Sequence, residues 1–223
     1  MEEFVPGHIE TFDGITNSRG EILFYTGQVM RVTPLAMLQG AGENVSYTQN
    51  VQQLDLAEIG QRVVKAFDVR NRFFHFEFFR LDEDRGALGG IGDFVALEVN
   101  MRPAGGYTPD MINYAHSTDV YKIWADMVAY DKSHLASTLS HDSHNALSRP
   151  WSVQYYCVFA SRRDIYTYKH SLEEVRGRYG DVLVMCERMP EILSGAMGQQ
   201  MFTVKVKSKE EKDEFIEFIH EKI

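Results

Sequence analysis

Two acidic side chains and an amide occupy positions from which they could bind a divalent cation. Glu77 is the only acid in the aromatic run 73–79, where burying a carboxylate is costly unless a cation or a hydrogen-bond donor compensates it. Glu98, Asn100 and Arg102 follow at every second position, so in a strand they project from one face. Mg²⁺ prefers carboxylate and amide oxygens and usually takes further ligands from nucleotide phosphates. The pattern therefore indicates a Mg²⁺–phosphate site with one fixed cation beside it.

The elements that must position these residues are two strands joined by a turn. Residues 81–93 between them are polar and rich in glycine, which is typical of a flexible turn between apolar strands. If the strands pair, Glu77 and Glu98 can face one pocket. The alternative is that both are strand acids without a ligand.

These residues also resemble the C-terminal half of an ATP-grasp domain. Glu77, the stretch 98–102 and the glycine pair 105–106 match the metal strands of that family. Residues 2–14 are similar to its adenine-holding hinge strand and the strand after it, and residues 109–121 to the helix that follows the metal strands. The resemblance covers about residues 1–130. It implies an ATP- and Mg²⁺-dependent (or Mn²⁺-dependent) carboxylate–amine ligase that forms an acyl phosphate from a small-molecule carboxylate before an amine attacks.

The resemblance also assigns roles to individual residues. Glu77 and Glu98 would hold the metal ions, and Asn100 would give its amide oxygen to the second ion. Arg102 would be the catalytic residue that holds the acyl phosphate, because a guanidinium matches such oxyanions with two parallel hydrogen bonds. The remaining contacts would bind ATP: Glu2 and Val5 at the hinge, Glu10 near the ribose or phosphates, Phe79 against the adenine, and the backbone of Gly105 and Gly106 close to the anion.

Three of these residues have alternatives that the sequence leaves open. Phe79 could be ordinary core packing. Arg102 could form a salt bridge with Glu98 or Glu77. His75, two residues before Glu77, could be a partner of that acid, but a core histidine with satisfied hydrogen bonds is the commoner situation.

A complete ATP-grasp domain has an N-terminal subdomain with a glycine-rich loop and lysines that cover the phosphates. The sequence contains neither that subdomain nor a Gly-x-x-x-x-Gly-Lys-Ser/Thr motif to replace it. We therefore expect a fragment that is inactive alone and has the missing subdomain as its partner. An alternative is a carboxylase similar to biotin carboxylase, although no acid lies between Arg102 and Asp110. A non-catalytic lobe that binds nucleotide weakly is the other alternative.

Composition narrows the class of protein. The 223 residues are 44% hydrophobic and 25% charged, with a formal net charge of −9. This charge argues against binding to nucleic acid or to an anionic membrane surface. Cys157 and Cys186 lie in apolar runs, which suits reduced core residues of a cytoplasmic protein. No apolar stretch reaches the ~18 residues that a membrane-spanning helix needs. Homodimer formation is left open.

The expected fold is α+β. Residues 1–130 would form an ATP-grasp C-terminal lobe, a mainly antiparallel sheet with flanking helices, and 131–150 a linker before a small α+β domain at 151–223. The lobe is expected to contain a hairpin of strands 8–16 and 20–26, a helix over 54–69, the metal hairpin and a helix over 111–127. The small domain is expected to contain strands 152–161, 164–169, 181–187 and 201–207, with helices 171–179 and 208–222. Each of these two helices starts with a Ser-x-x-Glu capping box.

Overall fold

The computed structural model describes residues 4–32, 42–49, 54–133 and 155–223, which form a single antiparallel sheet with helices on both faces. The eight strands follow the order β5-β4-β1-β2-β3-β6-β8-β7. They are β1 Gly7–Thr16, β2 Ile22–Met30, β3 Val45–Gln49, β4 Arg72–Leu81, β5 Phe94–Asn100, β6 Tyr156–Arg162, β7 Leu183–Arg188 and β8 Gln200–Val206. The helices are α2 Leu54–Ala66, η1 Gly86–Leu88, α3 Thr108–His116, α4 Val120–Tyr130, α6 Leu172–Tyr179, α7 Glu191–Met197 and α8 Lys209–His220.

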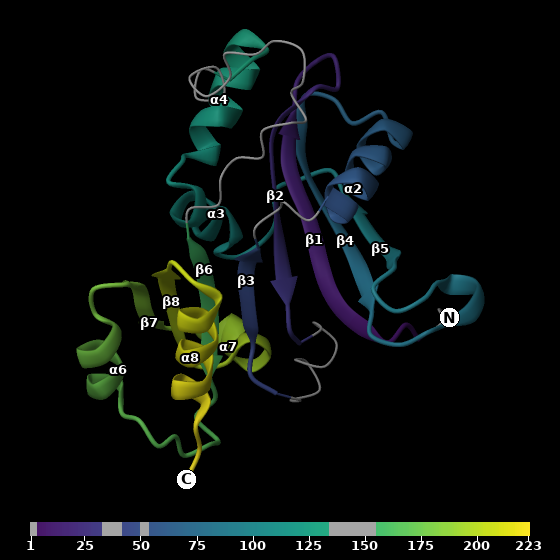
Figure 1. Ribbon diagram of the computed structural model, residues 1–223. Helices are drawn as coiled ribbons and strands as arrows, with labels where there is room; N and C mark the ends of the chain where they lie inside the picture. Colours follow the sequence, from purple (N-terminus) through teal and green to yellow (C-terminus); the bar gives the residue numbers. More distant parts are fainter. Residues whose placement is uncertain (1–3, 33–41, 50–53, 134–154) are drawn as a thin grey trace.

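Strand side chains alternate between the two faces of the sheet, and each face has its own helices (Figure 1). On one face, α2 packs on the even-numbered aromatic residues of β4 and on Phe12 of β1, while α6 and α8 pack on Val158 and Phe202. On the other face, α3 and α4 pack on Ile15 and Phe24, and α3 also covers β6 and β8. Phe12 is paired with Phe76 and Thr11 with Glu77, so the alternation of side chains places Phe12 and Glu77 on opposite faces.

Both predicted hairpins are confirmed as paired strands, and the helix predicted over 54–69 is present over 54–66. β1 pairs with β2 and with β4, and β4 pairs with β5, each in antiparallel fashion. Both predicted capping boxes are present, because Ser171 and Ser208 each accept from the backbone N–H of the glutamate three residues later. No helix among the described residues is long and apolar enough to cross a membrane.

The predicted helix 111–127 is wrong as a single element. Ser117 has a left-handed φ of 49° and ends α3, and the Asp119 side chain accepts from the Lys122 N–H to start α4. The side chain of Asn113 meanwhile accepts from the Val120 N–H at 2.8 Å. Polar side chains compete with helical hydrogen bonds at such a break, so an apolar stripe that runs across it does not mark one helix.

The predicted strand 164–169 is also absent. The Tyr166 N–H donates to the Arg163 carbonyl in a turn, and Tyr168 forms only an isolated bridge with Lys222. Three elements were not predicted: β3, the short η1 within the predicted turn 81–93, and α7. Because β3 pairs with both β2 and β6, strands from the predicted lobe and from the predicted small domain share one sheet. The proposed domain boundaries stay a prediction.

Two helical glycines offer a test of the packing between α2 and the sheet. A Cβ at Gly60 would overlap the ring of Phe12, whereas a Cβ at Gly177 of α6 would meet nothing within 4 Å. We expect Gly60→Ala to lower the free energy of unfolding, because overpacking costs about 1–3 kcal/mol. Gly177→Ala should raise it by roughly 0.5–1 kcal/mol, the ordinary gain of alanine in a helix. Urea unfolding of both variants checks the pair, and equal effects would contradict this packing.

Candidate metal and nucleotide site

One face of the sheet carries two polar rows between two apolar rows. Residues directly opposite each other in antiparallel strands share a face, so the pairing registers define these rows. From β5 to β2, one polar row consists of Glu98, Glu77, Thr11 and Gln28, and the next of Asn100, His75, Asp13 and Thr26. The flanking apolar rows contain Ile9 with Phe79, and Ile15 with Phe73 and Phe24.

The two predicted metal carboxylates are brought together. Glu77 and Glu98 are direct partners in the β4–β5 ladder, a relation that places Cβ atoms about 4.5–5.5 Å apart. The register shifts next to this pair, so Leu97 is an extra residue on β5. Such bulges re-aim side chains. The Glu77 side chain is only 13% exposed, whereas Glu98 is exposed, so the pair joins an enclosed ligand to an accessible one.

His75 lies between Glu77 and a second buried carboxylate, that of Asp13. Its Nδ1 donates to Asp13 Oδ1 at 2.6 Å and its Nε2 donates to Glu77 Oε1 at 2.9 Å. Carboxylate oxygens only accept hydrogen bonds, so both ring nitrogens carry a proton and the ring is an imidazolium. Burial lowers the pKa of His75, but the charges and hydrogen bonds of Asp13 and Glu77 outweigh it and raise that pKa to about 10. Glu77 is therefore compensated by a cation even without a metal ion.

Asp13 and Thr11 are site residues to which the sequence interpretation assigned no role. The Thr11 hydroxyl donates to Asp13 Oδ2 and accepts from the Gln28 N–H at 3.2 Å. Thr11, Asp13 and His75 are all at most 5% exposed. The available signal was the phase of the strand: Thr11 and Asp13 share a face with Ile9 and Ile15, so they form a polar pair between two apolar positions of the same strand.

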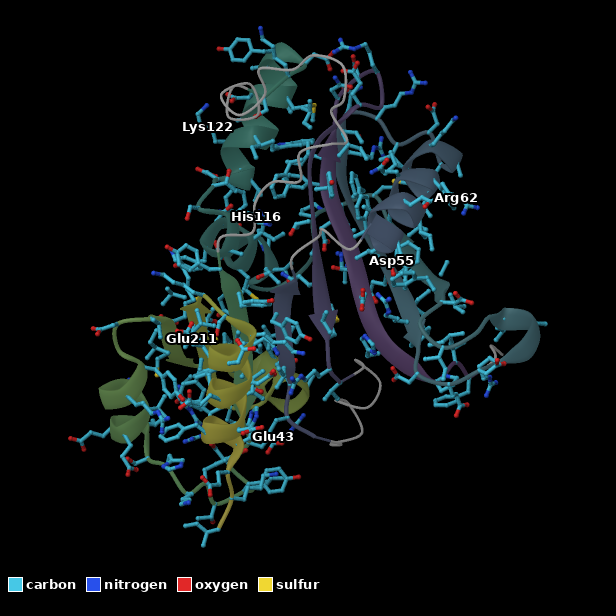
Figure 2. All side chains as sticks on the ribbon, in the orientation of Figure 1. Glu43, Asp55, Arg62, His116, Lys122 and Glu211 are labelled. Atoms are coloured by element: carbon cyan, nitrogen blue, oxygen red, sulfur yellow. The ribbon has the colours of Figure 1, made fainter. Side chains whose placement is uncertain are left out.

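His116 lies at the end of α3 (Figure 2) and joins the second polar row through a contact with Thr26 of β2. Its Nε2 lies 2.8 Å from the Thr26 hydroxyl, and its ring edge contacts Phe24. Burial lowers the pKa of His116 to about 4, so this ring is neutral near pH 7, in contrast to His75. Thr26 is the neighbour of Asp13 in the β1–β2 ladder. A neutral hydrogen-bonding group therefore borders the charged part of the site.

Asn100 and Arg102 end the metal strand. The buried Asn100 Nδ2 has no hydrogen-bond partner in the described part of the chain, so no hydrogen bond through this nitrogen fixes the orientation of the amide. β5 ends at Asn100, and the exposed Arg102 lies in the bend beyond it, where its Nη1 donates to the Pro103 carbonyl at 3.0 Å. Among the described residues no carboxylate lies within ion-pair distance of Arg102. The alternative of a salt bridge to Glu98 or Glu77 is thus not observed.

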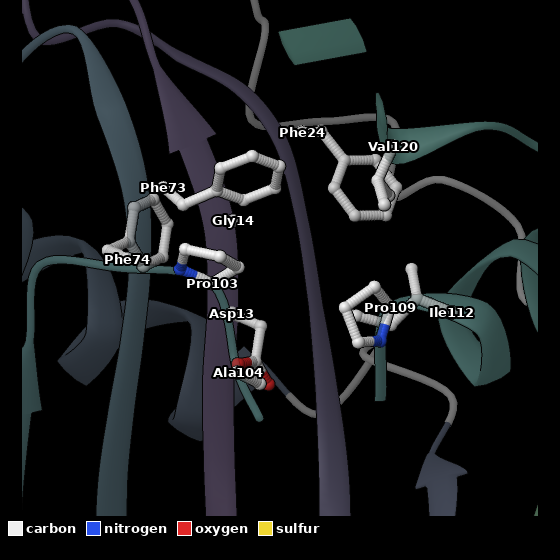
Figure 3. A pocket seen from close by; sticks show the side chains of 10 residues that line it. All are labelled: Asp13, Gly14, Phe24, Phe73, Phe74, Pro103, Ala104, Pro109, Ile112 and Val120. Atoms are coloured by element: carbon white, nitrogen blue, oxygen red, sulfur yellow. The ribbon is translucent and has the colours of Figure 1, made fainter. Parts of the chain in front are cut away.

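The segment that follows Arg102 packs beside Asp13. Pro103 and Ala104 line a small pocket with a cavity of about 20 Å³, which has room for about one water molecule. Figure 3 shows the Asp13 carboxylate at one end of this pocket and the rings of Phe24 and Phe73 at the other. A Cβ at Gly105 or Gly106 would meet nothing within 4 Å, so this backbone is open to close approach by a ligand.

The residues predicted to contact the nucleotide do not all lie on the face of the sheet that carries Glu77. Phe79 is half-buried beside the row of Glu77, where an adenine contact is expected, and Val5 is half-buried at the start of the described chain. Glu2 lies outside the described residues. Glu10 is three residues from Asp13, so strand alternation puts it on the opposite face of the sheet from Glu77. There it contacts His8 at 3.2 Å, and this geometry does not bring it to the metal pair.

The oxygen ligands offered by Glu77, Glu98 and Asn100 suit Mg²⁺ better than they suit a transition metal bound entirely by protein side chains. Among the described residues no three His, Cys, Asp or Glu side chains are arranged to hold a metal. Two carboxylates and one amide form an incomplete set of hard oxygen ligands. Mg²⁺ is commonly bound in this way, with one or two carboxylates from the protein and the remaining ligands from phosphate and water. The residues present therefore fit a Mg²⁺ or Mn²⁺ ion whose remaining ligands come from phosphate or water.

The two carboxylates should respond oppositely to removal of their charge. Glu77→Gln loses the buried contact with His75, and a hydrogen bond between charged groups is worth about 1.5–3 kcal/mol. The expected result is a loss of that order in the free energy of unfolding. Glu98→Gln should raise it slightly, because like charges directly opposite in a sheet repel. Urea unfolding in the presence of EDTA at pH 7 measures both, and destabilisation of both variants to the same extent would contradict the pairing.

Comparison with known proteins shows a fold that sequence similarity alone does not reveal. No protein-family profile and no curated protein sequence matches this chain. Solved structures do match. Phosphoribosylglycinamide synthetase from Anaerococcus prevotii has a TM-score of 0.62 at 12% identity, over 97% of this chain and 52% of its own. L-amino acid ligase from Bacillus licheniformis has a TM-score of 0.61 at 12% identity, over 96% of this chain and 50% of its own.

A third similar structure contains ligands. The biotin carboxylase domain of 2-oxoglutarate carboxylase from Hydrogenobacter thermophilus, in complex with MgADP and bicarbonate, has a TM-score of 0.55 at 10% identity, over 92% of this chain and 43% of its own. These similarities show an ATP-grasp-like fold, and the predicted α+β fold class is confirmed. The chain spans about half the length of the structures it matches.

Proposed function

We propose that this chain supplies the metal-binding half of an ATP-dependent carboxylate–amine ligase. In this reaction a carboxylate oxygen takes the γ-phosphoryl group of ATP, which releases ADP and forms an acyl phosphate. An amine then attacks the acyl carbon, inorganic phosphate leaves with the C–O bond electrons, and the amine loses a proton as the amide forms. The observation that carries the proposal is the direct opposition of Glu77 and Glu98, with Asn100 in the adjacent row.

The roles of the residues follow from their placement. Glu77, Glu98 and Asn100 would hold Mg²⁺ or Mn²⁺, which neutralises phosphate charge when bound. Arg102 is exposed and has no carboxylate partner among the described residues, so its guanidinium is available to hold the acyl phosphate. Gly105 and Gly106 leave their backbone open beside it. Phe79 would contact the adenine from the neighbouring row.

A carboxylase is the second candidate, and one comparison favours it. The similar biotin carboxylase domain binds MgADP and bicarbonate. The stretch between Arg102 and Asp110 contains no acid, whereas a carboxylase of that kind has a substrate-activating acid shortly after the arginine. We therefore rank the ligase first. A lobe that binds nucleotide without catalysis is the third candidate.

A phosphate-release assay on the complete protein tests the function. ATP cleavage should require both a carboxylate and an amine, and a screen of amino-acid pairs samples both substrate types. Cleavage that depends on bicarbonate instead would support the carboxylase. Absence of cleavage with every pair and with bicarbonate would favour the non-catalytic lobe.

We further propose that the other half of the nucleotide enclosure, including the phosphate-covering loop, comes from outside these 223 residues, in a cytoplasmic ligase. The chain covers 52% and 50% of the two ligases compared above, which supports this division. Residues 1–223 alone should then be inactive. They should also bind Mg²⁺-ATP with a Kd no tighter than ~1 mM, equivalent to about 4 kcal/mol. Isothermal titration calorimetry measures the affinity, and micromolar binding would show that the nucleotide site is complete within this chain.

A further inference from the structure

The side chain of Glu77 is held by one of its two oxygens. Oε1 accepts from His75 at 2.9 Å, whereas Oε2 has no hydrogen-bond partner among the described residues. Since Glu98 is the direct neighbour of Glu77 on β5, the fixed oxygen determines how the second one is presented to a cation between the two strands. The orientation of this carboxylate therefore depends on the orientation of the His75 ring.

The His75 ring is in turn fixed by Asp13 and Thr11. Asp13 Oδ1 accepts from His75 Nδ1 at 2.6 Å, and the Thr11 hydroxyl donates to the other Asp13 oxygen. All three residues are at least nine-tenths buried on adjacent strands. A continuous chain of hydrogen bonds thus runs from Thr11 through Asp13 and His75 to Oε1 of Glu77.

We propose that Asp13 and His75 are positioning residues that orient Glu77 for binding of the divalent cation. This inference rests on the proposed function and adds two residues to it. Asp13 balances the positive charge of His75 at contact distance, so the pair changes the net charge of the metal site little. Its contribution is geometric: it fixes one Glu77 oxygen and leaves the other free beside Glu98 and Asn100.

Because the charges of Asp13 and His75 nearly cancel, the effect of the Glu77 orientation on metal binding can be separated from the effect of net charge. Asp13→Asn removes one negative charge, His75→Gln removes one positive charge, and the double variant leaves the net charge unchanged. If charge alone mattered, the single variants would shift metal affinity in opposite directions and the double variant would bind like the wild type. If orientation matters, both single variants and the double variant lose affinity.

The experiment is a titration of the full 223-residue chain with Mn²⁺ alone at pH 7, with free Mn²⁺ measured by electron paramagnetic resonance. We expect the Asp13→Asn/His75→Gln variant to bind Mn²⁺ about 10–100-fold more weakly, the usual cost of removing residues that orient a metal ligand. His170→Gln/Glu221→Gln is the matched control, because it removes a His–Glu pair at 3.0 Å in the C-terminal part, in which the histidine is half-buried and the glutamate exposed. This control should bind as tightly as the wild type.

The outcomes of this experiment distinguish failure of the positioning role from failure of the proposed metal site. Wild-type affinity in the double variant overturns the positioning role while leaving the metal site intact. Wild-type chain that binds no Mn²⁺, or binds it equally well as Glu77→Gln, overturns the metal site itself. Should the double variant fail to fold, Thr11→Val removes the hydrogen bond to Asp13 without a change of charge. Its unaltered Mn²⁺ affinity would likewise overturn the proposal.

Discussion

If the complete protein is the proposed ligase, replacement of Glu98 by glutamine is expected to lower its kcat at least ~100-fold, on the scale of losing one charge-stabilising group in an active site. Glu98 is the exposed member of the pair, directly opposite Glu77, and it is the carboxylate best placed to meet a metal ion that arrives with a nucleotide. The substitution keeps the size of the side chain and removes only its charge. Steady-state phosphate release at saturating Mg²⁺-ATP measures the effect.

A glutamate on the other face of the sheet is the control for this change. Glu58 is an exposed residue of α2, which packs against the face opposite to Glu77. Glu58→Gln carries the same chemical change and should leave kcat near the wild-type value. Near wild-type turnover in Glu98→Gln would contradict the metal assignment. Among the described residues, Glu98 is the β5 residue paired with Glu77, so another side chain of that strand could not replace it.

Arg102→Lys is expected to lower kcat about 10–100-fold and to leave the KM for ATP almost unchanged. Lysine keeps the charge but loses the planar fork that matches an oxyanion with two hydrogen bonds. A hydrogen bond to a charged group is worth about 1.5–3 kcal/mol, and each ~1.4 kcal/mol of barrier is a factor of ten in rate. A fall in kcat alone is the pattern of an interaction made mainly in the transition state.

The exposed position of Arg102 allows a change in kcat to be assigned to the lost contact and not to misfolding. The side chain is exposed and its one hydrogen bond in the described structure goes to the adjacent Pro103 carbonyl, so the lysine variant should fold normally. Arg176→Lys on the exposed surface of α6 is the matched control. A raised KM for ATP with unchanged kcat would instead place Arg102 in ground-state nucleotide binding.

The metal hairpin could be predicted because its signals are local. Alternation along residues 73–79 and 94–100, with a polar glycine-rich stretch between, determines two strands and their shared face. The same alternation places Glu10 on the face opposite to Asp13, a placement that the sequence interpretation did not use.

The partners of Glu77 could not be predicted in the same way. Asp13 is 62 residues from His75 in sequence, and only the pairing of β1 with β4 brings them together. β3 was missed for a related reason: five residues in a loop-rich stretch become a strand because β2 and β6 lie on either side of them. The break between α3 and α4 depends on the Asn113 side chain and the left-handed Ser117, which an apolar stripe does not reveal.

Trapping of the acyl phosphate tests the central claim most directly. The complete enzyme is supplied with ATP, Mg²⁺ and a single carboxylate substrate, with hydroxylamine in place of the amine. A carboxylate–amine ligase forms the acyl phosphate, hydroxylamine attacks its carbonyl carbon, and a hydroxamate accumulates along with ADP and phosphate. The account predicts hydroxamate formation that is lost in Glu98→Gln and strongly reduced in Arg102→Lys. ATP cleavage that requires bicarbonate, with no hydroxamate from any carboxylate, would contradict it.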